Sequence, residues 1–154
     1  MRLLAAILTA IGFLLGLVNS AYAQATIRTS DPCFGTLKSS VAINVTSATT
    51  TSLVAISGNN AIFVCGFVMT IAPSATAADT AQFEYGTGSA CSSPTVLTGT
   101  FGNGDLTSAA GVAVISYGIG GTSFVAPSGT GLCIVTTGTA VNVQGVLTYV
   151  QQGS

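Results

Sequence analysis

The sequence predicts an all-β protein, an antiparallel sandwich of jelly-roll type with about eight or nine short strands and two disulfides. The composition favours Thr, Ser, Gly, Ala and Val, which is typical of strands and turns. Apolar residues make up 49% of the chain and charged residues only 5%, so a core can form although the surface has little charge. Short apolar runs also alternate with turn residues at intervals of about 8–12 residues, as in sandwiches and barrels.

Residues 1–23 have the pattern of a secretory signal peptide. Met1-Arg2 supplies a positive start, residues 3–18 are apolar, and Ala21-Tyr22-Ala23 forms a small-x-small cleavage site. The sequence therefore predicts a signal-peptide helix that is cleaved before Gln24; an uncleaved membrane anchor is the alternative. The mature chain is then a single domain, residues 24–154, that is secreted or periplasmic and has no further contact with the membrane.

Four cysteines follow the predicted cleavage site. An even number of cysteines in an exported chain implies two disulfides. Zinc binding is disfavoured because the chain has no histidine and no Cys-x-x-Cys pair. Three connectivities remain open. The sequence favours Cys33 with Cys65 and Cys91 with Cys133, on the sole ground that a Gly-Thr-Gly turn precedes each member of the second pair.

The longest apolar run, residues 62–71, is predicted to be the central strand. It is apolar at nearly every position, so we expect a strand covered on both faces, with Cys65 as a disulfide anchor. Before it, residues 24–38 are expected to form an irregular arm that Cys33 holds in place. Asp31-Pro32 favours a turn within that arm.

The remaining strands are predicted from alternation and from flanking turns. In residues 82–85, Phe83 and Tyr85 should face inward and Glu84 should be solvated on the outer face; we expect this strand to pair with the central one. In the last strand, Gly145 interrupts an inward apolar row and predicts a bulge or a close backbone approach. The other predicted strands are 41–46, 53–56, 95–101, 112–117, 122–125, 132–135 and 141–149.

The chain lacks the residues of common catalytic sites. Without histidine there is no Ser-His-Asp or Cys-His site, and two disulfides leave no free thiol. A hydrolase would need two carboxylates in one cleft, Glu84 with Asp79 or Asp105, yet loop aspartates are ordinary turn residues. Residues 102–105 faintly resemble a calcium loop but lack its run of acidic ligands. Residues 118–121 are Gly-rich, but no helix follows them to bind a phosphate. We therefore expect no enzyme, no cofactor and no metal.

The surface predicts partners only in broad terms. With so few basic residues, nucleic acid is not an expected partner. Low charge offers little repulsion against association, so self-association or a larger assembly is expected. A glycan or a protein ligand is the other possibility, with four aromatic residues as candidate contacts; ordinary packing is the alternative for each of them. These candidates are Phe34, Phe101, Tyr117 and Phe124.

Four segments together, residues 63–66, 85–91, 126–133 and 145–152, carry a resemblance that covers most of the mature chain. Their Cys and Gly motifs, in this order, resemble a group of small secreted β-proteins found in proteobacterial genomes and in bacteriophage or metagenomic viral contigs. The resemblance implies an exported or virion-associated β-protein and brings no established activity or site. We therefore expect a structural or assembly protein of a virion or cell surface, with a secreted binding module as the alternative.

Overall fold

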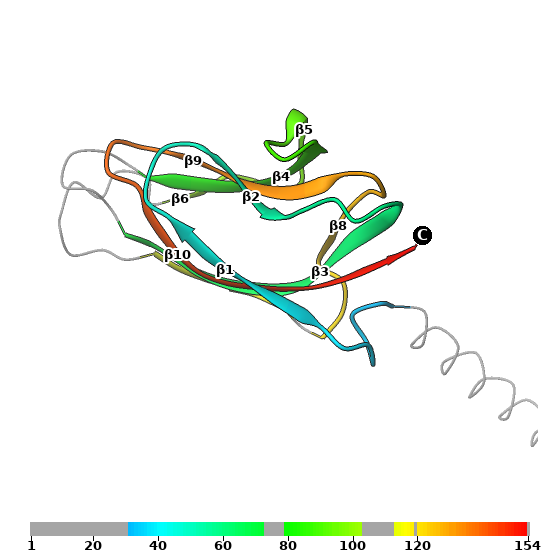
Figure 1. Ribbon diagram of the computed structural model, residues 1–154. Helices are drawn as coiled ribbons and strands as arrows, with labels where there is room; N and C mark the ends of the chain where they lie inside the picture. The colour runs from blue at the N-terminus through cyan, green and yellow to red at the C-terminus, as the bar shows by residue number, and fades with distance from the viewer. Residues whose placement is uncertain (1–30, 73–78, 103–112, 119, 154) are drawn as a thin grey trace, which may run out of the picture.

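The computed structural model describes residues 31–72, 79–102, 113–118 and 120–153, and it is all-β, as predicted. Within these residues, ten strand segments form two antiparallel sheets that lie one over the other (Figure 1). The segments are β1 (Ser39–Val45), β2 (Thr50–Val54), β3 (Asn60–Ala72), β4 (Thr80–Thr87), β5 (Ser92–Val96), β6 (Phe101–Gly102), β7 (Ala113–Tyr117), β8 (Phe124–Ala126), β9 (Gly131–Thr137) and β10 (Asn142–Gly153). The predicted signal peptide lies outside the described residues.

The strand order is that of a jelly roll. Sheet A has the order β1-β10-β3-β7, with β8 also on β3, and sheet B has the order β2-β9-β4-β5, with β6 also on β4. Because β7 and β8 pair with successive parts of β3, and β5 and β6 with successive parts of β4, each pair is one interrupted strand. The eight resulting strands then pair first with last, second with seventh, third with sixth and fourth with fifth. This is a long hairpin rolled into two sheets.

The rolled topology corrects one prediction about β4. The sequence predicted that residues 82–85 pair with the central strand, but β4 belongs to the other sheet and pairs with β9, β5 and β6. In a jelly roll, the connection between the third and fourth strands crosses from one sheet to the other. The third and fourth strands, β3 and β4, therefore face each other across the core and do not share hydrogen bonds.

The predicted central strand is confirmed, but its long apolar run has another cause than the one expected. The register of β3 on β10 shifts between Thr148 and Tyr149, which oppose Gly66 and Val64, so Cys65 is the extra residue of a β-bulge. The bulge changes which of the alternating residues face the core. On the N-terminal side of the bulge Val64 faces the core, and on its C-terminal side Phe67 does so. Val68 points outward and is 39% exposed. The run is continuous because two alternating patterns meet there, not because both faces are covered along its length.

Gly145 on β10 lies against the backbone of β3. A Cβ atom at this position would meet the carbonyl oxygen of Val68 and would lie 2.7 Å from the Cα atom of Met69. The register stays regular at this residue, where Gly145 pairs with Met69. Of the two predicted explanations for this glycine, the structure therefore supports a close approach of backbones and not a bulge.

Each sheet carries one disulfide, and the cysteines pair as the sequence favoured: Cys33 with Cys65 and Cys91 with Cys133. Cys33 and Cys65 form a small cluster with Val150, separate from the main core between the sheets. Leu132 and Ile134 on β9 are core residues, so alternation places Cys133 between them on the outer face of sheet B. The disulfides therefore attach the N-terminal arm to sheet A and the segment before β5 to sheet B.

Asp31 fixes the predicted turn in the N-terminal arm. Its carboxylate accepts hydrogen bonds from the hydroxyl of Thr122 at 2.6 Å, from the backbone N–H of Thr122 at 2.9 Å and from the N–H of Cys33 at 2.9 Å. These bonds, with the Thr122 hydroxyl the largest contribution, hold the pKa of Asp31 below its ordinary value. The arm is thus tied to the connection between β7 and β8 as well as to β3.

Candidate functional site

Five aromatic side chains meet between the two sheets. We call them the aromatic cluster: Phe67 on β3, Phe83 on β4, Phe101 on β6, Tyr117 on β7 and Phe124 on β8. The ring of Phe67 is central, at 4.9 Å from that of Phe83 in an edge-to-face arrangement and at 6.3 Å from that of Tyr117 in a stacked one. Such geometries stabilise aromatic pairs beyond the area that they bury.

The aromatic cluster forms one wall of a cavity of about 250 Å³. Tyr117 lines the cavity and is 55% exposed, whereas Phe83 is wholly buried in the core. The residues that line the cavity are Phe67, Leu97, Thr98, Phe101, Ile115, Tyr117, Ser123 and Phe124. Only two of them, Thr98 and Ser123, carry aliphatic hydroxyls, and none is charged.

Three of the four aromatic candidates from the sequence come together in this cavity. Phe101, Tyr117 and Phe124 line it, whereas Phe34 lies on the N-terminal arm and is 51% exposed. The sequence did not single out Leu97, Ile115 or Ser123, because each looks like an ordinary strand or turn residue. Only the packing of β7 and β8 against the segment between β5 and β6 brings them together.

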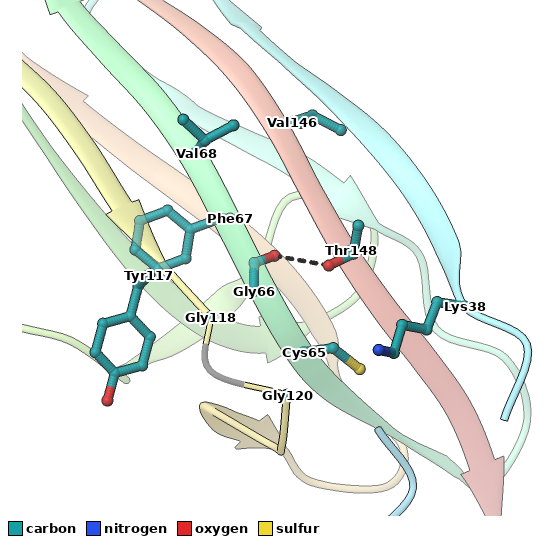
Figure 2. Close-up of a pocket in the computed structure, with 10 residues that line it drawn as sticks. All are labelled: Lys38, Cys65, Gly66, Phe67, Val68, Tyr117, Gly118, Gly120, Val146 and Thr148. Carbon is teal, nitrogen blue, oxygen red and sulfur yellow. Dashed lines mark hydrogen bonds between the residues drawn. The ribbon is translucent and has the colours of Figure 1, made fainter. Parts of the chain in front are cut away.

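A second hollow lies on the outer face of sheet A, at the β-bulge. It measures about 340 Å³ and is lined by Lys38, Gly66, Val68, Tyr117 and Thr148, among others. Figure 2 shows Lys38 reaching from the start of β1 toward Cys65, and the hydroxyl of Thr148 donating to the carbonyl oxygen of Gly66. That hydrogen bond measures 3.1 Å. The floor of this hollow is backbone, because the bulge residue and Gly66 bring no large side chain to it.

Beyond this hollow, the outer face of sheet A carries no charge in its two central rows. The strand register sets Ala42, Val146, Val68 and Ser116 in one row across β1, β10, β3 and β7, and Asn44, Gln144, Thr70 and Val114 in the next. Val146 is 38% exposed and Val114 67% exposed. Val68 and Val146 lie side by side on neighbouring strands (Figure 2). The face therefore presents valines among small hydroxyl and amide groups.

The carboxylates of the described residues do not form a catalytic pair. Asp79 precedes β4 and Glu84 is five residues further on, so they lie roughly 17 Å apart along the strand and on opposite faces of sheet B. The predicted partner Asp105 lies outside the described residues. The carboxylate of Asp31 accepts hydrogen bonds from Cys33 and Thr122 and so holds the N-terminal arm. No group of three or more Cys, Asp or Glu side chains that could hold a metal ion occurs among the residues that the structure describes.

Asp79 is buried, against the expectation of an ordinary loop aspartate. Its side chain is 0% exposed, and neither carboxylate oxygen has a hydrogen-bond partner among the residues that the structure describes. The carboxylate lies against Gly138, where a Cβ atom would collide with it. Nothing in the local sequence around Asp79 signals this burial, because the residue that makes room for it is 59 positions away.

Glu84 points to the outer face of sheet B as predicted, but the predicted solvation is wrong. The side chain is only 5% exposed, and within the described part of the chain its Oε1 atom has no hydrogen-bond partner. Glu84 lies opposite Cys133 on one side and Val96 on the other, and the Cys91–Cys133 disulfide brings Cys91 over this face. Burial removes water from the carboxyl group and raises its pKa above the ordinary value of 4.5.

The raised pKa of Glu84 predicts a pH-dependent stability. As pH rises above 4.5, the unfolded chain loses this proton before the folded protein does, so the free energy of unfolding falls until the folded carboxyl is also ionised. Glu84→Gln removes this ionisation, so the variant should become more stable relative to wild type as pH rises from 4.5 to the pKa of the folded carboxyl. Urea denaturation of both proteins at pH values on either side of 4.5 measures the difference. Parallel stability curves for the two proteins would contradict the assignment.

Comparison with known proteins adds no further constraint: no family model, curated protein or solved structure matches the chain. Within the described ranges, no helix has the length and apolar character needed to cross a membrane. The two disulfides fit an oxidising extracellular or periplasmic environment.

Proposed function

We propose that this protein is a non-enzymatic, exported structural protein that assembles on a virion or a cell surface through the outer face of sheet A. The observation that carries the proposal is the pair of uncharged rows on that face, with Val68, Val114 and Val146 exposed. The predicted signal peptide and its cleavage before Gln24 support export, and the disulfides fit it.

The low charge of this face is compatible with assembly through it. Soluble β-proteins commonly protect exposed sheet edges and faces with lysine or other charges. In the described residues of sheet A, the two edge strands β1 and β7 contain no charged residue, and Lys38 lies just before β1. A neutral surface of valines and small polar groups can pack against a similar surface without unpaired charges being buried. A second copy of this chain satisfies that requirement.

Fold-level analogy is compatible with the proposal but does not carry it. Jelly rolls occur in virus capsids, where they pack into shells, and also in lectins. Fold alone does not determine function. The likeness to lectins matches the alternative function, a secreted module that binds a glycan or a host protein. For such a ligand, the hollow beside Tyr117 and Lys38 offers an aromatic ring and a cation.

Size-exclusion chromatography with light scattering on residues 24–154 tests the assembly. We expect the mass of the wild-type domain to rise with concentration above that of a monomer. Val68→Lys combined with Val146→Lys places two positive charges in the centre of the face and should yield a monomer. Val96→Lys is the matched control, because Val96 is a 57% exposed valine on β5 of sheet B, and it should assemble like wild type. A wild-type protein that remains a monomer at high concentration contradicts the proposal.

A further inference from the structure

We propose that the cavity beside the aromatic cluster is a binding site for one uncharged aromatic ring that carries a single hydroxyl group, a phenol-type ligand. The cavity lies between the sheets, so this site is distinct from the outer face of sheet A through which we propose assembly. Each proposal can therefore fail without the other.

The size of the cavity suits one substituted ring. An apolar cavity of about 150 Å³ is sufficient to bind benzene in a protein core. The cavity here measures about 250 Å³, which is enough for one ring and a small substituent. Its aliphatic walls come from Leu97 and Ile115, and its aromatic walls come from Phe67, Phe101 and Phe124.

The polar groups of the cavity select the chemistry of the ligand. The Thr98 hydroxyl already accepts a hydrogen bond from the backbone N–H of Phe83 at 3.1 Å. The Ser123 hydroxyl forms no hydrogen bond with any residue that the structure describes, although the Ser123 backbone N–H is bonded to the Val64 carbonyl at 2.7 Å. A ligand hydroxyl can therefore pair with Ser123. A charged ligand finds no counter-charge, and most hydroxyls of a sugar would lose their hydrogen bonds to water without replacement.

The cavity is also held open by interactions that do not depend on a ligand. Phe67 is fixed against Phe83 and lies 5.7 Å, between ring centroids, from Phe101, while Phe124 lies 5.4 Å from Phe83. The bond from Ser123 to Val64 fixes the segment that leads into β8. Rings that are already fixed lose little side-chain freedom when a ligand binds. A further ring inserted beside them gains edge-to-face contacts.

Ligand titrations followed by protein NMR test the site, with phenol, benzene, benzoate and glucose as probes. We expect phenol to give saturable shifts of the Leu97 and Ile115 methyl groups. Benzoate and glucose should bind at least about tenfold more weakly than phenol, because their charge or their hydroxyls remain unpaired. Glucose binding that equals or exceeds phenol binding would overturn the proposal and would favour the glycan-binding alternative.

Two variants make the test specific. Ser123→Ala should weaken phenol binding about tenfold and leave benzene binding unchanged, because only phenol uses the hydroxyl. Ile115→Phe should fill the cavity and abolish the shifts for both ligands. Its matched control is Val114→Phe, at the neighbouring residue of β7, whose side chain is exposed on the other side of the sheet. All samples are compared at a concentration at which chromatography shows one species of the same size.

The outcomes are separable even if one variant folds poorly. If the thermal unfolding of Ile115→Phe shows that it is not folded, the comparison of phenol with benzene in Ser123→Ala still decides the proposal. Absence of saturable shifts at Leu97 and Ile115 in the wild-type protein with both phenol and benzene overturns it. So does equal loss of phenol and benzene binding in Ser123→Ala.

Discussion

Phe83→Ala should lower the free energy of unfolding by about 4 kcal/mol, because it removes a large buried side chain that packs between the two sheets. Phe83 comes from sheet B, is 0% exposed, and contacts the rings of Phe67 and Phe124 from sheet A. Truncation leaves a cavity between rigid strands that cannot close over it. Loss of buried apolar surface and loss of ring contacts then act in the same direction.

Chemical denaturation of the Phe83→Ala domain measures this effect. Phe34→Ala is the matched control, since Phe34 is 51% exposed on the N-terminal arm and its truncation should change the stability by less than about 0.5 kcal/mol. If the two variants lose similar stability, the core between the sheets is not organised around Phe83. A Phe83→Leu variant should recover part of the loss, because it refills part of the same space.

Removal of the Cys33–Cys65 disulfide should cost about 4 kcal/mol. The two cysteines are 32 residues apart, and a cross-link over a loop of this length restricts the unfolded chain by about that free energy in the chain-entropy treatment. The native state also loses a contact, because Cys33, Cys65 and Val150 pack together on the outer face of sheet A. Cys65→Ala combined with Cys33→Ala tests the effect without leaving a free thiol.

The effect is measured as the secreted yield and the protease resistance of the double cysteine variant. We expect lower secreted yield and faster proteolysis than for wild type. Both effects should be larger than for the carboxylate change Asp105→Asn. A variant that is exported and as protease-resistant as wild type would show that Cys65 is not an anchor. Alkylation of all four thiols in unreduced wild-type protein would also contradict the disulfide framework.

The sequence predicted the features of the fold that depend on short-range patterns. Alternation located most strands within a few residues, and the apolar run at residues 62–71 identified β3 as central in its sheet. Gly145 signalled a close approach that the structure confirms. These features follow from the period of two of a strand and from the missing side chain of glycine, which are visible in the chain itself.

The errors arose where distant segments meet. Glu84 was expected in solvent, because alternation reveals the face of a strand but not what covers that face. The pairing of β4 was wrong, because hydrogen-bond partners in a jelly roll are set by how the long hairpin rolls up. The buried carboxylate of Asp79 depends on Gly138, which belongs to another part of the chain.

The sequence alone therefore determined the all-β class, the expectation of two disulfides without a firm pairing, and the lack of histidine, since each depends on composition or on local periodicity. Only the tertiary structure decided that Phe101, Tyr117 and Phe124 enclose one cavity with Ser123, and that sheet A presents uncharged rows to solvent. The physical reason is that a cavity or a face is made by side chains from several strands. Their relative positions depend on sheet order and register, which no single segment of the chain encodes.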